Sequence, residues 1–276
     1  MKENAIIRFG PYLASGPTRL NVHDAVCTSL RRPARQRNGM LASASAILVV
    51  SSDGGSLRSV LTGRRVIPTG FLTSRKTGRA MPFEGMNEAA LLKYCEVDTR
   101  VVDYLSQPFR FEFVLDGAKR IYIADCARVL DDGTLEVIEV KGEHTRLGDP
   151  DYAAKLERVS QLCAELGWRF RLVTRRQMLG PKVVFANVDF IQSRRQVMFD
   201  EACACRAIEH LERAGGEASL GRLAEFWGGW QKGLAALQAM MVRRWLAIDV
   251  TAPISPESFA TILELAPATL LGRGGQ

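Results

Sequence analysis

The sequence predicts an α/β protein in which a mixed sheet is flanked by helices and a small helical domain follows. Two apolar runs on either side of Asp131-Asp132-Gly133 read as a hairpin, and residues 149–174 read as a helix followed by a strand. This strand–strand–helix–strand order is typical of a mixed sheet covered by helices. From about residue 199 the pattern changes to consecutive helices. With 276 residues, 47% of them hydrophobic, the chain can form one good core and a small second one.

The pattern along the chain divides it into three segments, of which the third is residues 196–276. Residues 1–42 have poor periodicity and predict an extended basic arm, whereas 43–195 form the central domain, with short strands before residue 72. Residues 81–98 predict a helix, because Leu91, Leu92 and Cys95 follow Glu88 by three, four and seven residues. Glu88 therefore lies on the apolar stripe, where a carboxylate needs a cationic partner. Glu84 lies one turn earlier, at the rim of a site or as a first-turn acid.

The predicted hairpin brings charged side chains together. Asp125 lies in its first apolar run, and Glu139 and Lys141 lie in its second. Residues two apart on a strand face the same side, and a short turn makes the two strands antiparallel neighbours. Two acids and an ammonium can then converge, as required to hold a divalent cation and activate a water molecule. The alternative is an ordinary hairpin with a solvated charged face; the third acid, Glu88, favours the site.

Residues 196–276 predict a winged-helix-like domain of three helices and a hairpin. In such domains the third helix, here Gln231 to Arg244, often reads DNA. Its polar face offers only Gln231, Lys232, Gln238 and Arg243, which is thin for base recognition. The sequence therefore favours docking of a protein partner over reading of bases by this domain.

The charge distribution is one-sided. The chain has 37 Lys and Arg against 30 Asp and Glu, and residues 1–80 hold 13 basic and 3 acidic side chains. Arginine suits bidentate contact with phosphate, so a nucleic-acid partner is expected. The predicted DNA contacts are Arg31, Arg32, Arg35, Arg37, Arg75, Lys76 and Arg79. A solubilising arm, or an arm that docks an acidic protein, is the alternative.

Composition also favours some classes of protein and compartment over others. No apolar run approaches membrane-spanning length, and the N-terminus lacks the pattern of a secretion signal. The six cysteines have no disulfide spacing and no CxxC pair, and with three histidines they do not predict a zinc site. We expect a protein of the reducing bacterial cytoplasm, associated with the nucleoid and not with a membrane.

The order of helix acid, Asp, and Glu-x-Lys resembles that of the PD-(D/E)xK nucleases, whose fold is restriction-endonuclease-like. The closer resemblance is to TnsA, the endonuclease subunit of heteromeric transposases. It is carried by SRKTGRAMPFEGMNE, by the helix and strand in NEAALLKYCEVDTRVVDYLSQPF, and by YIADCARV and VIEVKG, from about Lys76 to Lys141. Ala124 stands where the superfamily pattern has proline.

This resemblance implies a metal-dependent endonuclease that cuts the non-transferred strand at transposon ends in double-stranded DNA. It also implies an integrase-type partner transposase and an ATPase regulator, which the C-terminal domain would engage. Mg²⁺ is the expected cofactor, and Mn²⁺ would substitute for it. The expected metal ligands are Glu88, Asp125, Glu139 and the carbonyl of Val140. Lys141 is expected to contact the attacking water or the scissile phosphate as a point charge.

Two other functions remain open from the sequence. One is a stand-alone nuclease for defence or repair, and the other is a catalytically silent DNA-binding assembly factor. The presence of Glu88, Asp125, Glu139 and Lys141 together argues against the silent form.

Overall fold

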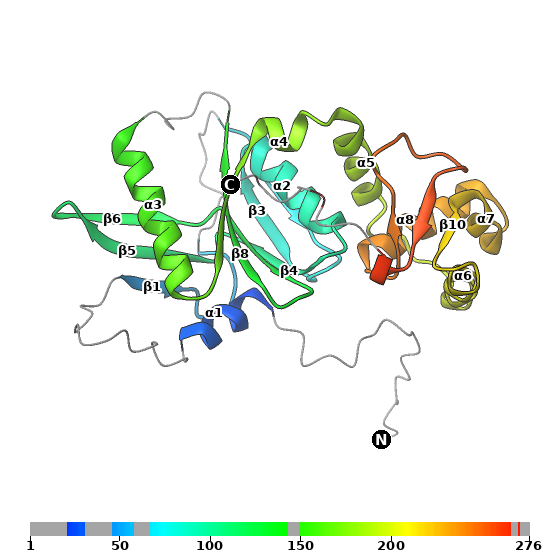
Figure 1. Cartoon of the computed structure of the whole chain (residues 1–276), viewed down its shortest axis with the longest axis horizontal. Helices are drawn as coiled ribbons and strands as arrows, with labels where there is room; N and C mark the ends of the chain where they lie inside the picture. The colour runs from blue at the N-terminus through cyan, green and yellow to red at the C-terminus, as the bar shows by residue number, and fades with distance from the viewer. Residues whose placement is uncertain (1–20, 31–45, 58–66, 143–148, 266–269, 271–276) are drawn as a thin grey trace, which may run out of the picture.

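The computed structural model describes residues 21–30, 46–57, 67–142, 149–265 and 270. Its mixed α/β architecture, with sheets flanked by helices and a helical C-terminal region, confirms the predicted fold class (Figure 1). The central sheet has the strand order β4-β7-β8-β9, in which β8 and β9 are parallel and the other pairs antiparallel. Its strands are β4 (Val101–Ser106), β7 (Cys126–Leu130), β8 (Leu135–Lys141) and β9 (Arg169–Thr174).

A second sheet extends from the central one, with the order β1-β5-β6. It contains β1 (Ile47–Val50), β5 (Phe109–Leu115) and β6 (Ala118–Ile123), all paired antiparallel. Asp125 lies between β6 and β7, where the chain passes from one sheet to the other. The expectation that Asp125 lies within a strand was therefore wrong: the apolar run bends at Ala124 and Asp125, and its two halves pair with different partners.

Two N-terminal segments differ from the sequence-based expectation. Helix α1 (Val22–Leu30) buries Val22 and Val26 in the core, and the Val22 amide donates to Asp103 Oδ2 at 2.8 Å. This part of the predicted arm is thus packed against the central domain. Residues 81–84 belong to β3 (Ala80–Glu84), paired with β2 (Thr69–Thr73), and not to a helix. The helix begins only after Gly85, whose φ of 98° is favourable for glycine alone.

The helices around the central sheet have clear end signals. Helix α2 is Met86–Val97, α3 is Pro150–Glu165, α4 is Arg175–Leu179 and α5 is Lys182–Ser193. The Asp149 side chain caps α3 and Pro150 follows it, while Thr174 and Gln177 form a capping box on α4. Helix α3 connects the parallel strands β8 and β9 and lies over them and β5 (Figure 1).

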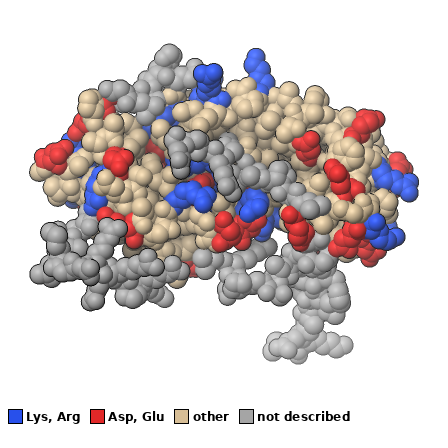
Figure 2. All heavy atoms as spheres, in the orientation of Figure 1, with Lys and Arg blue, Asp and Glu red and all other residues tan. Residues whose placement is uncertain are grey.

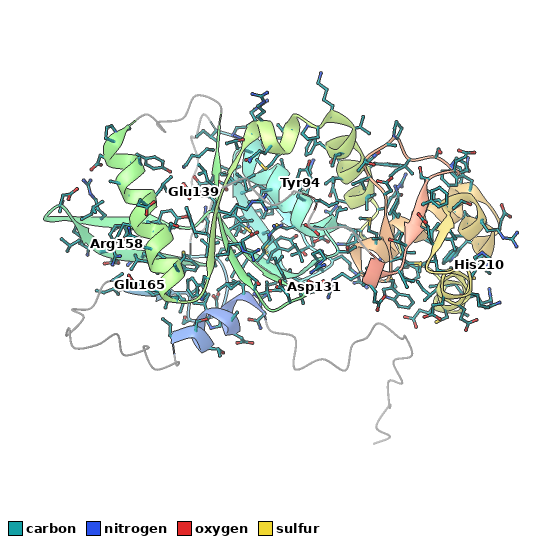
Figure 3. The ribbon with its side chains drawn as sticks, in the orientation of Figure 1. Tyr94, Asp131, Glu139, Arg158, Glu165 and His210 are labelled. Atoms are coloured by element: carbon teal, nitrogen blue, oxygen red, sulfur yellow. The ribbon has the colours of Figure 1, made fainter. Side chains whose placement is uncertain are left out.

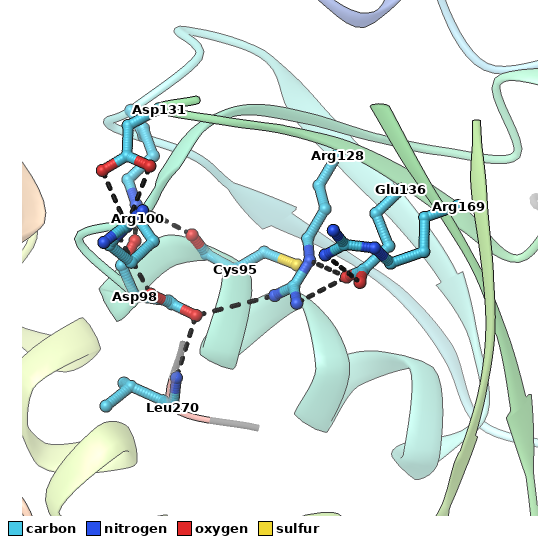
Figure 4. A network of polar contacts seen from close by, with 9 residues as sticks. Cys95, Asp98, Arg100, Arg128, Asp131, Glu136, Arg169 and Leu270 are labelled. Atoms are coloured by element: carbon cyan, nitrogen blue, oxygen red, sulfur yellow. Dashed lines mark hydrogen bonds and ion pairs between the residues drawn. The ribbon is translucent and has the colours of Figure 1, made fainter. Parts of the chain in front are cut away.

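A buried polar network joins α2 to the central sheet (Figure 4). Arg128 on β7 is fully buried, and its guanidinium lies 2.6 Å from Glu136 and 3.6 Å from Asp98. Asp98 also accepts a hydrogen bond from the backbone amide of Leu270 at 3.1 Å. One network of buried charges therefore joins three parts of the chain: the end of α2, the β7–β8 hairpin and the segment at Leu270.

The C-terminal region is mainly helical, as predicted, and its assignment as a winged helix stays a prediction. Its elements are α6 (Glu201–Arg213), β10 (Glu217–Ser219), α7 (Leu220–Ala224), η2 (Glu225–Trp227), α8 (Trp230–Val242), β11 (Ala247–Ile248), β12 (Phe259–Thr261) and η3 (Leu263–Leu265), with a small sheet ordered β10-β12-β11. The predicted domain boundary at 195–196 falls between α5 and α6 and stays a prediction. In the described part of the chain, no helix has the length and apolar character to cross a membrane.

Helix α8 is packed on most of its circumference. All residues from Ala236 to Val242 are buried, and α8 contacts α2, α5, α7 and η2. Of the four polar residues named for this helix, Gln238 is buried, and Arg243 donates to the carbonyls of Ala239 and Val197. Only Gln231 and Lys232 are exposed. A helix in this position has little surface to offer to a DNA groove.

Candidate active site

Strand β8 carries two of the predicted site residues on one side. Glu139 and Lys141 are two apart, and the Lys141 ammonium contacts Glu139 Oε1 directly. Glu139 lies between β8 and α3 (Figure 3) and is buried. Its Oε1 accepts a hydrogen bond from the Tyr152 hydroxyl at 2.8 Å, and its Oε2 accepts one from the Tyr122 hydroxyl at 2.9 Å. Burial alone would lower the pKa of Lys141, but the charge and hydrogen bond of Glu139 raise it.

Asp125 lies beside this pair. Its Oδ2 accepts a hydrogen bond from the backbone amide of Val140 at 2.8 Å, which ties the bend between the sheets to β8. Burial raises the pKa of Asp125 well above its ordinary value, and the negative charges of Glu139 and Glu88 add to the rise. The Val140 amide and Lys141 act in the opposite direction. Glu88, Glu139 and Lys141 therefore all lie within electrostatic reach of Asp125.

Glu88 comes from the first turn of α2. Its Oε2 accepts a hydrogen bond from the backbone amide of Glu84 at 2.8 Å, an arrangement similar to a capping box, because Gly85 has no side chain to cap the helix. Glu88 is half-buried, as expected for an acid on the apolar side of the helix. Glu84 ends β3 and is not a first-turn acid of α2.

A cavity of about 430 Å³ opens next to these groups. It joins the first turn of α2 to the strand that carries Glu139 and Lys141, and to the start of α4. Its lining residues are Ile67, Pro68, Glu84, Gly85, Met86, Asn87, Glu88, Val140 and Arg175. The structure thus places Glu88 and Val140 in one hollow that also contains an arginine.

The chemistry of these side chains fits a hard divalent cation. The predicted site combines three carboxylic acids, Glu88, Asp125 and Glu139, with one ammonium, and carboxylate oxygens are the ligands that Mg²⁺ prefers. The positions of the side chains are a separate matter. Among the described residues, no group of three or more His, Cys, Asp or Glu side chains is arranged to hold a metal ion. Asp125, Glu139 and Glu88 each accept hydrogen bonds from the protein, so a metal would bind at the oxygen lone pairs that these contacts leave available.

The predicted DNA contacts divide into three groups. Arg31, Arg32, Arg35 and Arg37 lie outside the described residues. Lys76 is half-buried, and its ammonium donates to the carbonyls of Cys95 and Asp98 at 2.9 and 2.7 Å, where it caps the end of α2. Contact of Lys76 with a phosphate stays a prediction.

Arg75 and Arg79 lie in the turn between β2 and β3. Arg75 is exposed, whereas Arg79 is half-buried and donates to the carbonyl of Gly54 at 3.2 Å. On the face shown in Figure 2, basic and acidic side chains of the described residues are interspersed. Contact of Arg75 and Arg79 with DNA stays a prediction.

Four residues near the site were missed from the sequence. Tyr122 and Tyr152 donate to Glu139, while Asn87 and Arg175 line the cavity. Tyr152 lies four residues before the buried Leu156, so helical spacing puts its ring on the apolar stripe of α3 but does not reveal where the hydroxyl points. Arg175 follows the predicted strand 169–174 directly, and the ends of neighbouring parallel strands meet at one edge of a sheet. That register could have indicated Arg175, since Lys141 pairs with Thr174.

One comparison with known proteins covers this part of the chain. Residues 98–175 match the family model described as TnsA-like endonuclease N terminal, a segment that contains Asp125, Glu139 and Lys141 and begins just after α2. No curated protein matches the chain. Among solved structures, protein VC1899 from Vibrio cholerae is 23% identical, over 36% of this chain and only 26% of its own chain, with a TM-score of 0.24. Over residues 98–175, the chain is therefore related to the N-terminal domain of TnsA-like endonucleases.

Proposed function

We propose that this protein is a Mg²⁺-dependent DNA endonuclease that cleaves the non-transferred strand at transposon ends. It would act with a partner transposase and an ATPase regulator. The observation that carries the proposal is the convergence of Asp125, Glu139 and Lys141 at one end of the β7–β8 hairpin, within the segment related to TnsA-like endonucleases.

The roles of the residues follow from their chemistry. Asp125, Glu139 and Glu88 would hold the metal, with the Val140 carbonyl as a further oxygen ligand. When bound, Mg²⁺ supplies Lewis acidity that acidifies water and offsets the charge of a phosphodiester. The Lys141 ammonium is itself positively charged and cannot ligate a metal ion. It is therefore assigned to the scissile phosphate or the attacking water, where it offsets negative charge. Its half-buried position beside the carboxylates limits competition from bulk water.

The C-terminal region is assigned to protein docking. A winged-helix-like domain would be expected to present its third helix to DNA, but α8 is covered by α2, α5 and α7. The surfaces of α6, α7 and the small sheet would then be the places where the partner transposase or the ATPase regulator binds.

The first test is nicking of supercoiled DNA in Mg²⁺ or Mn²⁺, with and without the partner proteins. Asp125→Asn and Lys141→Ala should each lower the cleavage rate by about 10²- to 10³-fold, the loss typical of removing one electrostatic contact to a transition state. DNA affinity should fall far less than the cleavage rate, because the Arg-rich segments are unchanged. Asp132→Asn, in the exposed turn of the same hairpin, is the matched control and should cleave normally.

Unchanged cleavage by both site variants in the complete system would contradict the proposal. Efficient nicking without any partner would favour a stand-alone nuclease instead. DNA binding and complex assembly without cleavage by the wild type would favour a silent assembly factor.

A further inference from the structure

Tyr152 makes two separate contacts with the proposed catalytic pair. It is the third residue of α3, whose start is fixed by the Asp149 cap and by Pro150. Its hydroxyl donates to Glu139 Oε1 at 2.8 Å, and the Lys141 ammonium lies 4.7 Å from the centre of its ring. The first contact holds a carboxylate and the second holds a cation over an aromatic face. One side chain of α3 thus constrains both charged residues of β8.

Tyr122 completes the surroundings of Glu139. It reaches Glu139 Oε2 from β6 and is itself buried, with 3% of its surface exposed. An ionised carboxylate only accepts hydrogen bonds, and it has about four lone-pair sites. Tyr152 and Lys141 use two sites on Oε1, and Tyr122 uses one on Oε2. One acceptor site therefore remains, and its direction is fixed by the two tyrosines.

We propose that Tyr152 is a positioning residue of the nuclease: it orients Glu139 and Lys141 so that one oxygen of Glu139 and the ammonium face the reacting groups. This inference rests on the proposed function. If the ring of Tyr152 served packing alone, its hydroxyl would not be needed next to a buried carboxylate. The hydroxyl stands within hydrogen-bond distance of a group proposed to bind metal, and such supporting contacts tune the ligand that they hold.

The test compares Tyr152→Phe and Tyr152→Leu with the wild type. Tyr152→Phe keeps the ring beneath Lys141 and removes the hydroxyl, and Tyr152→Leu removes both contacts. Loss of a supporting contact to a metal ligand typically lowers metal affinity or activity by about 10- to 100-fold. We expect Tyr152→Phe to need about 10-fold more Mg²⁺ for half-maximal nicking, and Tyr152→Leu to lose more rate at saturating Mg²⁺. DNA affinity should not change.

Tyr94→Phe is the matched control. The Tyr94 hydroxyl is also buried and donates to a protein oxygen, the carbonyl of Met178 at 2.7 Å, but it does not touch Glu139 or Lys141. It should cleave with the wild-type Mg²⁺ requirement. Calorimetric titration of DNA-free protein with Mg²⁺ gives a second measurement that does not depend on cleavage, and Tyr152→Phe should bind the ion more weakly.

The possible outcomes separate this inference from the proposed function. If the wild type nicks DNA and Tyr152→Phe shows the same rate, Mg²⁺ requirement and Mg²⁺ affinity, the positioning role is wrong and the proposed function stands. If the wild type, with its partners, neither nicks DNA nor binds Mg²⁺, the proposed function fails, and the inference fails with it. An equal loss of cleavage in Tyr152→Phe and Tyr94→Phe would also overturn the positioning role, because the effect would then be structural.

Discussion

At the scale of single residues, Arg128 shows how the core tolerates charge. Its side chain is completely buried and lies against Glu136 and Asp98, which are also buried. The same Glu136 meets a second arginine, Arg169, whose side chain is 56% exposed and 3.7 Å away. Arg128 therefore contacts the Glu136 carboxylate from the protein interior, and Arg169 contacts it from the solvent-exposed side. A buried charge that loses its partner cannot recover hydration, whereas an exposed one can.

This contrast gives a prediction about stability. Arg128→Met should lower the free energy of unfolding by about 3–5 kcal/mol, because it leaves Glu136 and Asp98 buried without their shared cation. Arg169→Met should lower it by less than about 1 kcal/mol. Urea denaturation of both variants, followed by circular dichroism, measures the difference. Similar losses for both variants would show that the buried network does not support the fold as described.

At the scale of elements, the short helix α4 offers another matched pair. Arg175 and Arg176 are adjacent and exposed, but only Arg175 lines the cavity beside Glu88 and Val140. If the cavity receives the DNA strand near the scissile phosphate, only the first arginine can contact that phosphate. The opposite assignment would require α4 to turn about its own axis, against the Thr174 capping box.

Arg175→Ala should therefore weaken DNA binding and reduce the salt dependence of binding by about one phosphate contact. Arg176→Ala should bind DNA with nearly the wild-type affinity and salt slope. Fluorescence anisotropy with labelled duplex at several salt concentrations measures both quantities. A larger effect of Arg176→Ala than of Arg175→Ala would place the DNA on another face of α4.

The elements also show what the sequence could and could not predict. The β7–β8 hairpin, α3 and β9 were predicted because alternation, the Asp131-Asp132-Gly133 turn and the Gly167 stop are local signals. The strand β3 was missed because the helical pattern after Glu88 was extended back over residues 81–85, although Pro82 was a warning against a helix interior. The bend at Asp125 was not predicted, since the two halves of one apolar run belong to two different hairpins, β5–β6 and β7–β8, and the run itself does not mark where one ends.

The candidate site was predictable to a similar extent. Residue type and alternation were enough to name Glu139 and Lys141 as a pair, and the structure brings them into contact. The contacts of Tyr152 and Tyr122 with Glu139 depend on how α3 and β6 pack against β8, and no local pattern encodes that packing. Lys76 lies in a basic stretch that predicts DNA contact, and no local pattern indicated that its ammonium also caps α2.

At the scale of the whole molecule, the C-terminal region is attached to the central domain by specific contacts. The Arg244 guanidinium donates to the carbonyl of Thr99 at 2.7 Å, next to Asp98 in the buried network. Asn187 on α5 donates to the carbonyls of Val250 and Ala252. These contacts link α2, which carries Glu88, to the region proposed to bind partners.

Buried tyrosines on α2, β4 and β6 add a pH dependence to the stability of the central domain. Burial raises the pKa of Tyr94 to about 12, and it raises those of Tyr104 and Tyr122 well above the ordinary value. In the unfolded chain these phenols lose their protons near pH 10. Their contribution to stability is therefore full below about pH 10 and is lost as the pH rises toward 12, because the unfolded state then binds fewer protons. Urea denaturation over this pH range should show a steep loss, and Tyr94→Phe should make it shallower by up to about 1.4 kcal/mol per pH unit.

Stability that stays constant up to pH 12 would mean that these phenols are hydrated in the folded protein. An unchanged slope in Tyr94→Phe would assign the loss to the other tyrosines.

The packing of α8 against α5 also governs how the molecule can be divided for laboratory work. A shortened gene that ends after α5 would yield a product in which the part of α5 that packs against α8 is exposed to solvent. A gene that begins at α6 would expose the matching surface of α8. Newly wetted apolar patches of this kind promote aggregation. Insolubility of either fragment would therefore reflect the cut itself, and recombinant work on this protein needs both regions in one polypeptide.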